Sequence, residues 1–216
     1  MRFLCVSDIH GHAAALKAII REAEALGFDQ LIACGDLCFP GPDPLEVWKT
    51  LVQHRALCTQ GVGDRALAAI DPEKLSATGE AERARIERLR RAHRELGDII
   101  VARLGQLPPI ARLPIESGHT LLVVHGSPAD PTEPFDISMT DDELIALLGD
   151  EPGDLIVCGG SHVPFDRTVA DVRIVNVGSV GEAPAGDHAA ASIITTSQLG
   201  ISVEAFTVPL PAALPS

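Results

Sequence analysis

Short apolar runs alternate with amphipathic stretches over the first 160 residues. Apolar positions with helical spacing predict helices over 12–26 and 45–54, over a long region from about 80 to 104, and over 140–149. Thr140 is suited to cap the last of these, with Glu143 as its partner in a capping box. Between the helices we expect strands, over residues 2–6, 30–34, 56–60, 120–124 and 154–158. Such alternation predicts an α/β fold with a largely parallel sheet and crossover helices.

After residue 165 the pattern changes. Residues 167–181, 189–197 and 200–208 have the composition of short strands joined by turns, with no helix between them. We therefore expect the last quarter to add antiparallel strands, arranged in one interpretation as a second sheet packed on the first. Residues 1–208 are expected to form a single domain, because 216 residues provide one full core but are few for two. The Pro-rich tail 209–216 is expected to be disordered.

Composition narrows the class of protein. Apolar residues make up 46% of the chain and the formal net charge is −13, which argues against a broad nucleic-acid surface but not against a small phosphate ester. The Arg-rich region 82–96 has interleaved acidic residues and is interpreted as a solvated helix face, with anion binding as the alternative. Five cysteines without framework spacing indicate buried, reduced thiols. No segment has the pattern of a signal peptide or of a membrane span, so a soluble, cytoplasmic protein is expected.

Polar side chains follow the predicted strands one after another. Any single one of them is readily explained as a helix cap or a surface group. Together they would meet at the carboxyl edge of a parallel sheet, where open α/β sheets place their sites. Carboxylates mixed with imidazoles suit Mn, Fe, Zn, Co or Ni. The residues in this pattern are Asp8, His10, Asp36, Asp64, His125 and His162.

The same residues lie in six blocks that resemble, in order, the motifs of the calcineurin-like metallophosphoesterases. The blocks are DIHGH (8–12), CGDLCFPGPDP (34–44), GVGDRA (61–66), VVHGSP (123–128), GGSHVPFDR (159–167) and VNVGSVG (175–181). The chain is most similar to the small bacterial and archaeal phosphodiesterase branch. The resemblance implies a four-layer α/β/β/α sandwich and a metal-dependent hydrolase of phosphate esters, most of all of phosphodiesters. The substrate would be a small-molecule or a protein phosphate ester.

Two metal ions share a bridging Asp in that family. By resemblance, the first ion would bind Asp8, His10, Asp36 and His162. The second would bind Asp36 and His125, and both residues would also take part in catalysis. His125 would hold the second ion or contact phosphate directly.

Three positions depart from the family pattern. Val62 replaces an Asn ligand of the second metal, Gly160 replaces a His ligand, and Gly63 replaces a His that assists the leaving group in many relatives. Val62 has no metal-binding atom, and Gly160 offers only its backbone. We therefore expect one well-occupied divalent metal site and a second that is weak or empty.

Several alternatives remain open. A loop shift could recruit other donors, namely His12, Ser161, Asp64 or Cys58. The Gly-rich segment 176–182 could contact phosphate or simply form a tight turn. The chain could be a working hydrolase, or an impaired family member that retains one metal or a phosphate ligand for a structural or regulatory role. A homo-oligomer is compatible with the sequence.

Overall fold

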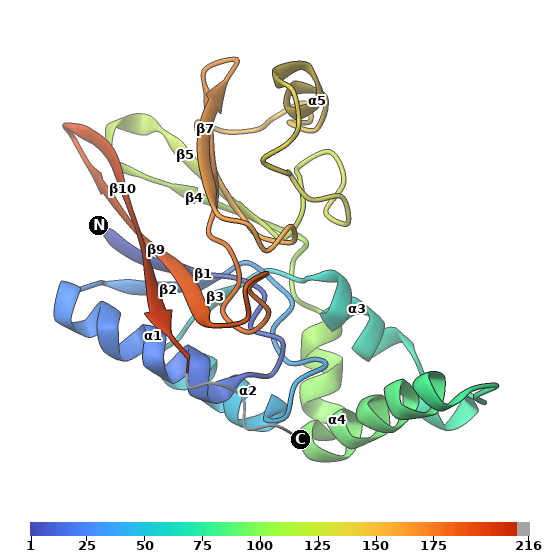
Figure 1. Cartoon of the computed structure of the whole chain (residues 1–216). Helices are drawn as coiled ribbons and strands as arrows, with labels where there is room; N and C mark the ends of the chain where they lie inside the picture. The colour runs from blue at the N-terminus through green and yellow to red at the C-terminus, as the bar shows by residue number, and fades with distance from the viewer. Residues whose placement is uncertain (211–216) are drawn as a thin grey trace.

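The computed structural model describes residues 1–210 and contains two five-stranded sheets that pack face to face, with helices on their outer faces (Figure 1). The α/β fold class and the layered arrangement expected from the sequence are therefore confirmed. The described helices include none that is both long and apolar enough to cross a membrane. Most of the predicted tail, from residue 211 onward, lies outside the described residues, whereas Pro209 is still part of a strand.

The first sheet has the order β10-β9-β1-β2-β3. Its strands β1, β2 and β3 run parallel, and β9 pairs antiparallel with both β1 and β10. The bounds are β1 Arg2–Val6, β2 Gln30–Ala33, β3 Leu57–Cys58, β9 His188–Ser197 and β10 Gly200–Pro209.

The second sheet has the order β4-β5-β6-β8-β7. Here β5, β6 and β8 run parallel, while the two edge strands are antiparallel to their neighbours. The bounds are β4 Ile110–Pro114, β5 Thr120–Val124, β6 Leu155–Cys158, β7 Phe165–Val169 and β8 Val172–Asn176.

Alternation along β1 builds the layers. Phe3 and Cys5 point into the apolar interface between the two sheets, whereas Leu4 and Val6 point to the helices on the outer face. The inter-sheet interface is completed by Ile32, Cys34, Leu121, Val123, Leu155, Val157, Val175, Val177 and Ile194. A strand that is buried on both faces has a continuous run of apolar residues in its sequence. The positions of β1, β5 and β6 could therefore be predicted from the sequence.

The helical layers differ in thickness. On the first sheet, α1 (Ala13–Leu26) and α2 (Pro44–Gln53) pack with their apolar faces inward, and α1 ends at Gly27, which adopts a φ of 80°. On the second sheet, the outer layer formed by the described residues is α5 (Asp141–Ala146) with its flanking loops. The predicted capping box of Thr140 and Glu143 is present at the start of α5.

The C-terminal strands do not form a sheet of their own. β7 and β8 extend the second sheet, whereas β9 and β10 return to the first and pair with β1. Likewise, the strands expected in one parallel sheet are divided, with β1, β2 and β3 in one sheet and β5 and β6 in the other. Both corrections concern strand partners, which the local hydrophobic pattern does not specify.

Several short elements were not predicted. They are α3 (Val62–Ala69), β4, and the 3-10 turns η1 (Pro72–Lys74) and η2 (Glu116–Gly118). α3 follows directly on Gly61 and includes Gly63, so its sequence resembles a loop more than a helix. It buries only Asp64 and Leu67, which leaves almost no apolar periodicity to detect.

The long helix is broken rather than continuous. α4 spans Glu80–Gly105, but Gly97 has non-helical dihedral angles (φ 69°, ψ 164°) and separates two helical segments. The first segment is covered with ion pairs, such as Arg91 with Glu95 and Arg94 with Glu87, as the solvated-face interpretation predicts.

All five cysteines are free thiols, and all except Cys58 are fully buried.

Asp64 joins α3 to the loop after β2. It is fully buried, and its carboxylate accepts hydrogen bonds at 3.0 Å from the backbone amides of Gly61 and Leu37. Burial, followed by the charge of Asp36, raises the pKa of Asp64 to about 6. Asp71 makes a similar but exposed bond to the amide of Glu73.

We predict that Asp64→Ala lowers the free energy of unfolding by about 2–4 kcal/mol, because it leaves two buried amides without acceptors. Asp71→Ala, the matched control, should cost about 1 kcal/mol or less, because water replaces the lost acceptor. Urea unfolding of both variants measures the difference. Equal losses would contradict the role assigned to Asp64.

Candidate metal centre

Ends of strands from both sheets meet at one edge of the sandwich. Asp8 and His10 follow β1, and Asp36 follows β2 in the first sheet, whereas His125 follows β5 and His162 follows β6 in the second. His162 is half-buried and the other four are buried. The convergence expected at the edge of a single sheet therefore arises between two sheets. All five residues that the family resemblance assigns to metal binding are brought together.

The backbone at the site is locally strained. Asp8, His10, Asp36 and His162 have φ values of 52°, 49°, 51° and 62°, in the left-handed region that residues with a Cβ rarely adopt. Such a conformation costs about 1 kcal/mol or more per residue and persists where surrounding contacts impose it. Here the loops after β1 and β2 hydrogen-bond to each other, with the His10 amide donating to the Asp36 carbonyl at 2.8 Å.

Each of the three imidazoles is oriented by a backbone carbonyl. The Nδ1 atoms lie 2.8–2.9 Å from carbonyl oxygens: His10 from Phe39, His125 from Cys34, and His162 from Glu182. A carbonyl can only accept, so Nδ1 carries the proton in all three rings. In the neutral ring, Nε2 then presents a free lone pair to the site, as in metal-ligating histidines.

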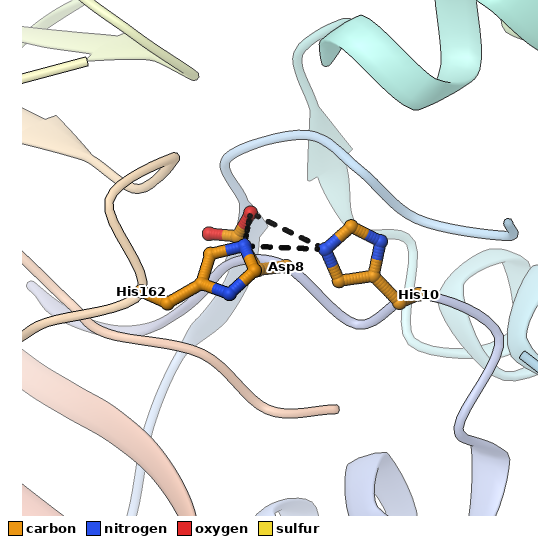
Figure 2. A group of neighbouring side chains, drawn as sticks. All are labelled: Asp8, His10 and His162. Atoms are coloured by element: carbon orange, nitrogen blue, oxygen red, sulfur yellow. Dashed lines mark hydrogen bonds and ion pairs between the residues drawn. The ribbon is translucent and has the colours of Figure 1, made fainter. Parts of the chain in front are cut away.

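Three of these side chains form a first ligand group (Figure 2). His10 Nε2 and His162 Nε2 face each other at 3.3 Å, and Asp8 Oδ1 lies 3.2 Å from His162 Nε2 and 3.7 Å from His10 Nε2. Asp8 Oδ2 accepts from the Gly160 amide at 2.9 Å, but Oδ1 is buried without a hydrogen-bond partner. A buried unpartnered carboxylate oxygen facing two imidazole lone pairs fits a divalent cation.

A second ligand group consists of Asp8, Asp36 and His125. Asp36 Oδ2 lies 3.5 Å from His125 Nε2 and 4.0 Å from His10 Nε2, so it stands between the two groups. Asp36 Oδ1 is engaged by the Gly63 amide at 2.6 Å. Asp36 therefore lies near His10 of the first group, while Asp8 is the residue common to both groups.

The departures from the family pattern lie beside the second group. Val62 is the first residue of α3, and its side chain is 46% exposed and offers no ligand atom. Gly160 has a φ of 77°, and a Cβ there would lie 2.9 Å from Pro134 Cβ. A histidine at position 160 would therefore be strained in this chain.

Of the four residues considered as substitute donors, His12, Asp64 and Cys58 lie outside both ligand groups. Asp64 is occupied by two backbone amides, and Ser161 Oγ accepts from Asn176 Nδ2 at 3.0 Å. Cys58 is directed to the Ala56 carbonyl, and His12 lies against Gly181.

The pKa values within the first group move in opposite directions. The Asp8 carboxylate raises the pKa of His162, against the opposing effect of burial. For Asp8, burial alone would raise the pKa, but His162, His125 and the Gly160 amide together lower it. Asp8 and His162 thus shift each other's pKa in the directions expected of a carboxylate beside an imidazole.

Sequence reasoning did not single out Glu182 or Asn176 as site residues. The Glu182 carbonyl fixes the His162 ring, and the Glu182 carboxylate lies 3.7 Å from His10 Nε2. Asn176 Nδ2 donates to the Gly159 carbonyl at 2.8 Å and holds the loop that carries His162. Both belong to the segment 176–182, whose glycines were the only signal in the sequence.

Two facing sheets with paired Asp and His ligands at their common edge define a metal-dependent phosphoesterase-like class of protein. The family model described as the calcineurin-like phosphoesterase superfamily domain matches residues 1–199. The chain belongs to this superfamily, whose members bind divalent metals. No curated protein matches the chain.

Solved structures share the fold at low sequence identity. A hypothetical protein of Pyrococcus horikoshii OT3 superposes with a TM-score of 0.82 at 20% identity, covering 98% of this chain and 89% of that one. A metallophosphoesterase of Sphaerobacter thermophilus gives 0.70 at 23% identity, covering 89% and 82%. A protein described as a novel archaeal phosphodiesterase gives 0.53 at 17% identity, covering 95% and 100%.

The pKa of His162 predicts how metal affinity depends on pH. A metal requires the neutral imidazole, and the pKa of His162 in the metal-free protein lies above its ordinary value. Affinity should therefore fall as the pH drops through that pKa, by up to about tenfold for each pH unit below it. Calorimetric titration of the metal-free protein with Mn²⁺ at about pH 8, 7 and 6 tests this. An affinity independent of pH would contradict it.

Proposed function

We propose that the protein is a metal-dependent phosphodiesterase that uses a divalent ion held mainly at the first ligand group. The observation that carries the proposal is the buried, unpartnered Asp8 Oδ1 facing the Nε2 atoms of His10 and His162. Without a cation or a proton between them, two imidazole lone pairs 3.3 Å apart would repel each other. Membership of the phosphoesterase superfamily supports the same function.

Each side chain then has a defined task. When bound, a divalent ion would supply a Lewis acid for the phosphoryl oxygens and lower the pKa of a coordinated water. Asp8, His10, Asp36 and His162 would hold the first ion, with Asp36 bridging towards the second position. His125 carries its proton on Nδ1, so its neutral ring is suited to bind a second ion rather than to donate a hydrogen bond to phosphate.

Local charge favours a diester over a monoester as substrate. Within residues 1–210, the ion pairs of Asp8 and Asp36 are with histidines only, and no Lys or Arg pairs with them. A phosphomonoester dianion would bring a second negative charge without a basic side chain to meet it, whereas a diester carries one charge. We propose a phosphodiester of a small molecule or a protein as substrate, and Mn, Fe, Zn, Co or Ni as metal. A cytoplasmic location remains a prediction.

A second candidate function follows from Val62 and Gly160. Among the described residues, the second ligand group consists of Asp36, His125 and the shared Asp8, with no side-chain donor from position 62 or 160. An impaired family member with one metal, kept for a structural or regulatory role, would have this ligand set. Hydrolysis of a phosphate ester distinguishes the two candidates, because only the phosphodiesterase would turn it over.

We predict that the protein purified without chelator contains about one metal per chain and hydrolyses bis(p-nitrophenyl) phosphate in Mn²⁺ faster than p-nitrophenyl phosphate. Metal analysis and release of nitrophenolate measure both quantities. His162→Ala is the control and should lose metal and turnover together. One metal per chain with no turnover on either ester would favour the second candidate, and preferential monoester hydrolysis would contradict the diester assignment.

Restoring the missing side-chain ligand at position 62 should strengthen the second site. We predict that Val62→Asn raises the Mn²⁺ stoichiometry from one towards two and lowers the dissociation constant of the second ion about tenfold or more. Val62→Ala is the matched control, because it removes the same side chain without adding a donor. Equal titration curves for both variants would show that position 62 does not reach the second ion.

A further inference from the structure

Glu182 places a carboxylate beside the first ligand group, close to His10. Its Oε2 lies 3.7 Å from His10 Nε2, as close as Asp8 Oδ1 does, and its backbone carbonyl accepts from His162 Nδ1. Its side chain is 41% exposed, so it stands on the solvent side of the buried Asp8.

The position of Glu182 is fixed by a dense set of backbone contacts. The Val180 amide donates to the Ser7 carbonyl at 3.0 Å, and the Gly181 amide donates to the Asp8 carbonyl at 2.9 Å. Ser179 Oγ donates to the Asp8 carbonyl at 3.0 Å and accepts from the Glu182 amide at 2.8 Å. The segment is therefore bonded directly to the loop that carries the first ligand.

Gly181 makes this approach possible. A Cβ at this position would lie 2.3 Å from the Ile9 carbonyl oxygen and 2.6 Å from the His12 ring, so a side chain would push the segment away. The requirement for glycine explains why Glu182 follows a Gly-rich stretch. The segment 176–182 could contact phosphate or form a tight turn, and these contacts support the tight turn. The turn places the Glu182 side chain beside the site.

The charge of Glu182 is directed at the ligand histidines rather than at a basic surface residue. Its only ion pair within the described chain is with His10, and its charge also acts on His12 and His162. No Lys or Arg in residues 1–210 is paired with it. The Glu182 carboxylate therefore has the histidines, and any cation bound to them, as its charged partners.

We propose that Glu182 is a further ligand of the first metal ion, a proposal that rests on the proposed metal site. In the proposed site Asp8, His10, Asp36 and His162 would supply four ligands, which would satisfy tetrahedral Zn²⁺. Mn²⁺ prefers six ligands with more oxygen among them. Glu182 supplies a fifth ligand and a third carboxylate, and so favours Mn²⁺ over Zn²⁺ at this position.

The test is calorimetric titration of the full-length, metal-free protein with Mn²⁺ and, separately, with Zn²⁺. Glu182→Gln removes the charge and keeps the size, and Glu182→Asp keeps the charge but shortens the reach. Glu204→Gln, at an exposed position on β10, is the matched control for loss of one negative charge. Thermal unfolding without metal checks that each variant is folded.

We expect both Glu182 variants to weaken Mn²⁺ binding about tenfold or more and Zn²⁺ binding much less, with Glu204→Gln unchanged. Unchanged Mn²⁺ affinity in Glu182→Gln overturns the assignment. A Glu182→Asp variant that keeps full affinity also overturns it, because charge alone would then suffice. Failure of the unaltered protein to bind either ion would instead refute the proposed metal site itself.

Discussion

The packing of the two sheets against each other is the constraint on which the site depends. Phe3, Cys5 and their counterparts on the second sheet form the apolar interface, and this interface sets the distance between strand ends on opposite sheets. Asp8 and Asp36 come from one sheet, and His125 and His162 from the other. Neither sheet alone contains a complete ligand group. Packing of the core therefore also brings the candidate metal ligands together.

At the site, the fold stabilises an arrangement that is unfavourable without a cation or a proton between the imidazoles. Four of the five ligand residues adopt left-handed backbone angles, and two imidazole nitrogens face each other beside a buried carboxylate oxygen. The hydrogen bonds that impose this geometry come from carbonyls of neighbouring loops, those of Cys34, Phe39 and Glu182. Strain and unpaired polar atoms concentrated at one place are the mark of a preorganised binding site, where the ligand supplies the missing interaction.

The two metal positions are unequal for reasons visible in single residues. The first has Asp8, His10 and His162 with free donor atoms, and Glu182 beside them. The second has His125 and Asp36, shares Asp8 with the first, and has no side-chain ligand at Val62 or Gly160. The ligand set is therefore poorly suited to a mechanism that needs two tightly bound ions. It is better suited to a mechanism that uses one tightly bound ion and a second ion taken up weakly from solution.

The sequence by itself determined the candidate ligands and most elements. β1, β5 and β6 are continuous apolar runs because both of their faces are buried, and Asp8, Asp36, His125 and His162 follow such runs. Only the tertiary structure decided which strands are neighbours, because hydrogen-bond partners of a strand are chosen across the whole chain rather than locally. It also placed Glu182, which reaches the site from the segment after β8 only because Gly181 packs against Ile9. The local hydrophobic pattern determines where helices and strands form, whereas contacts between distant segments determine which side chains meet at the site.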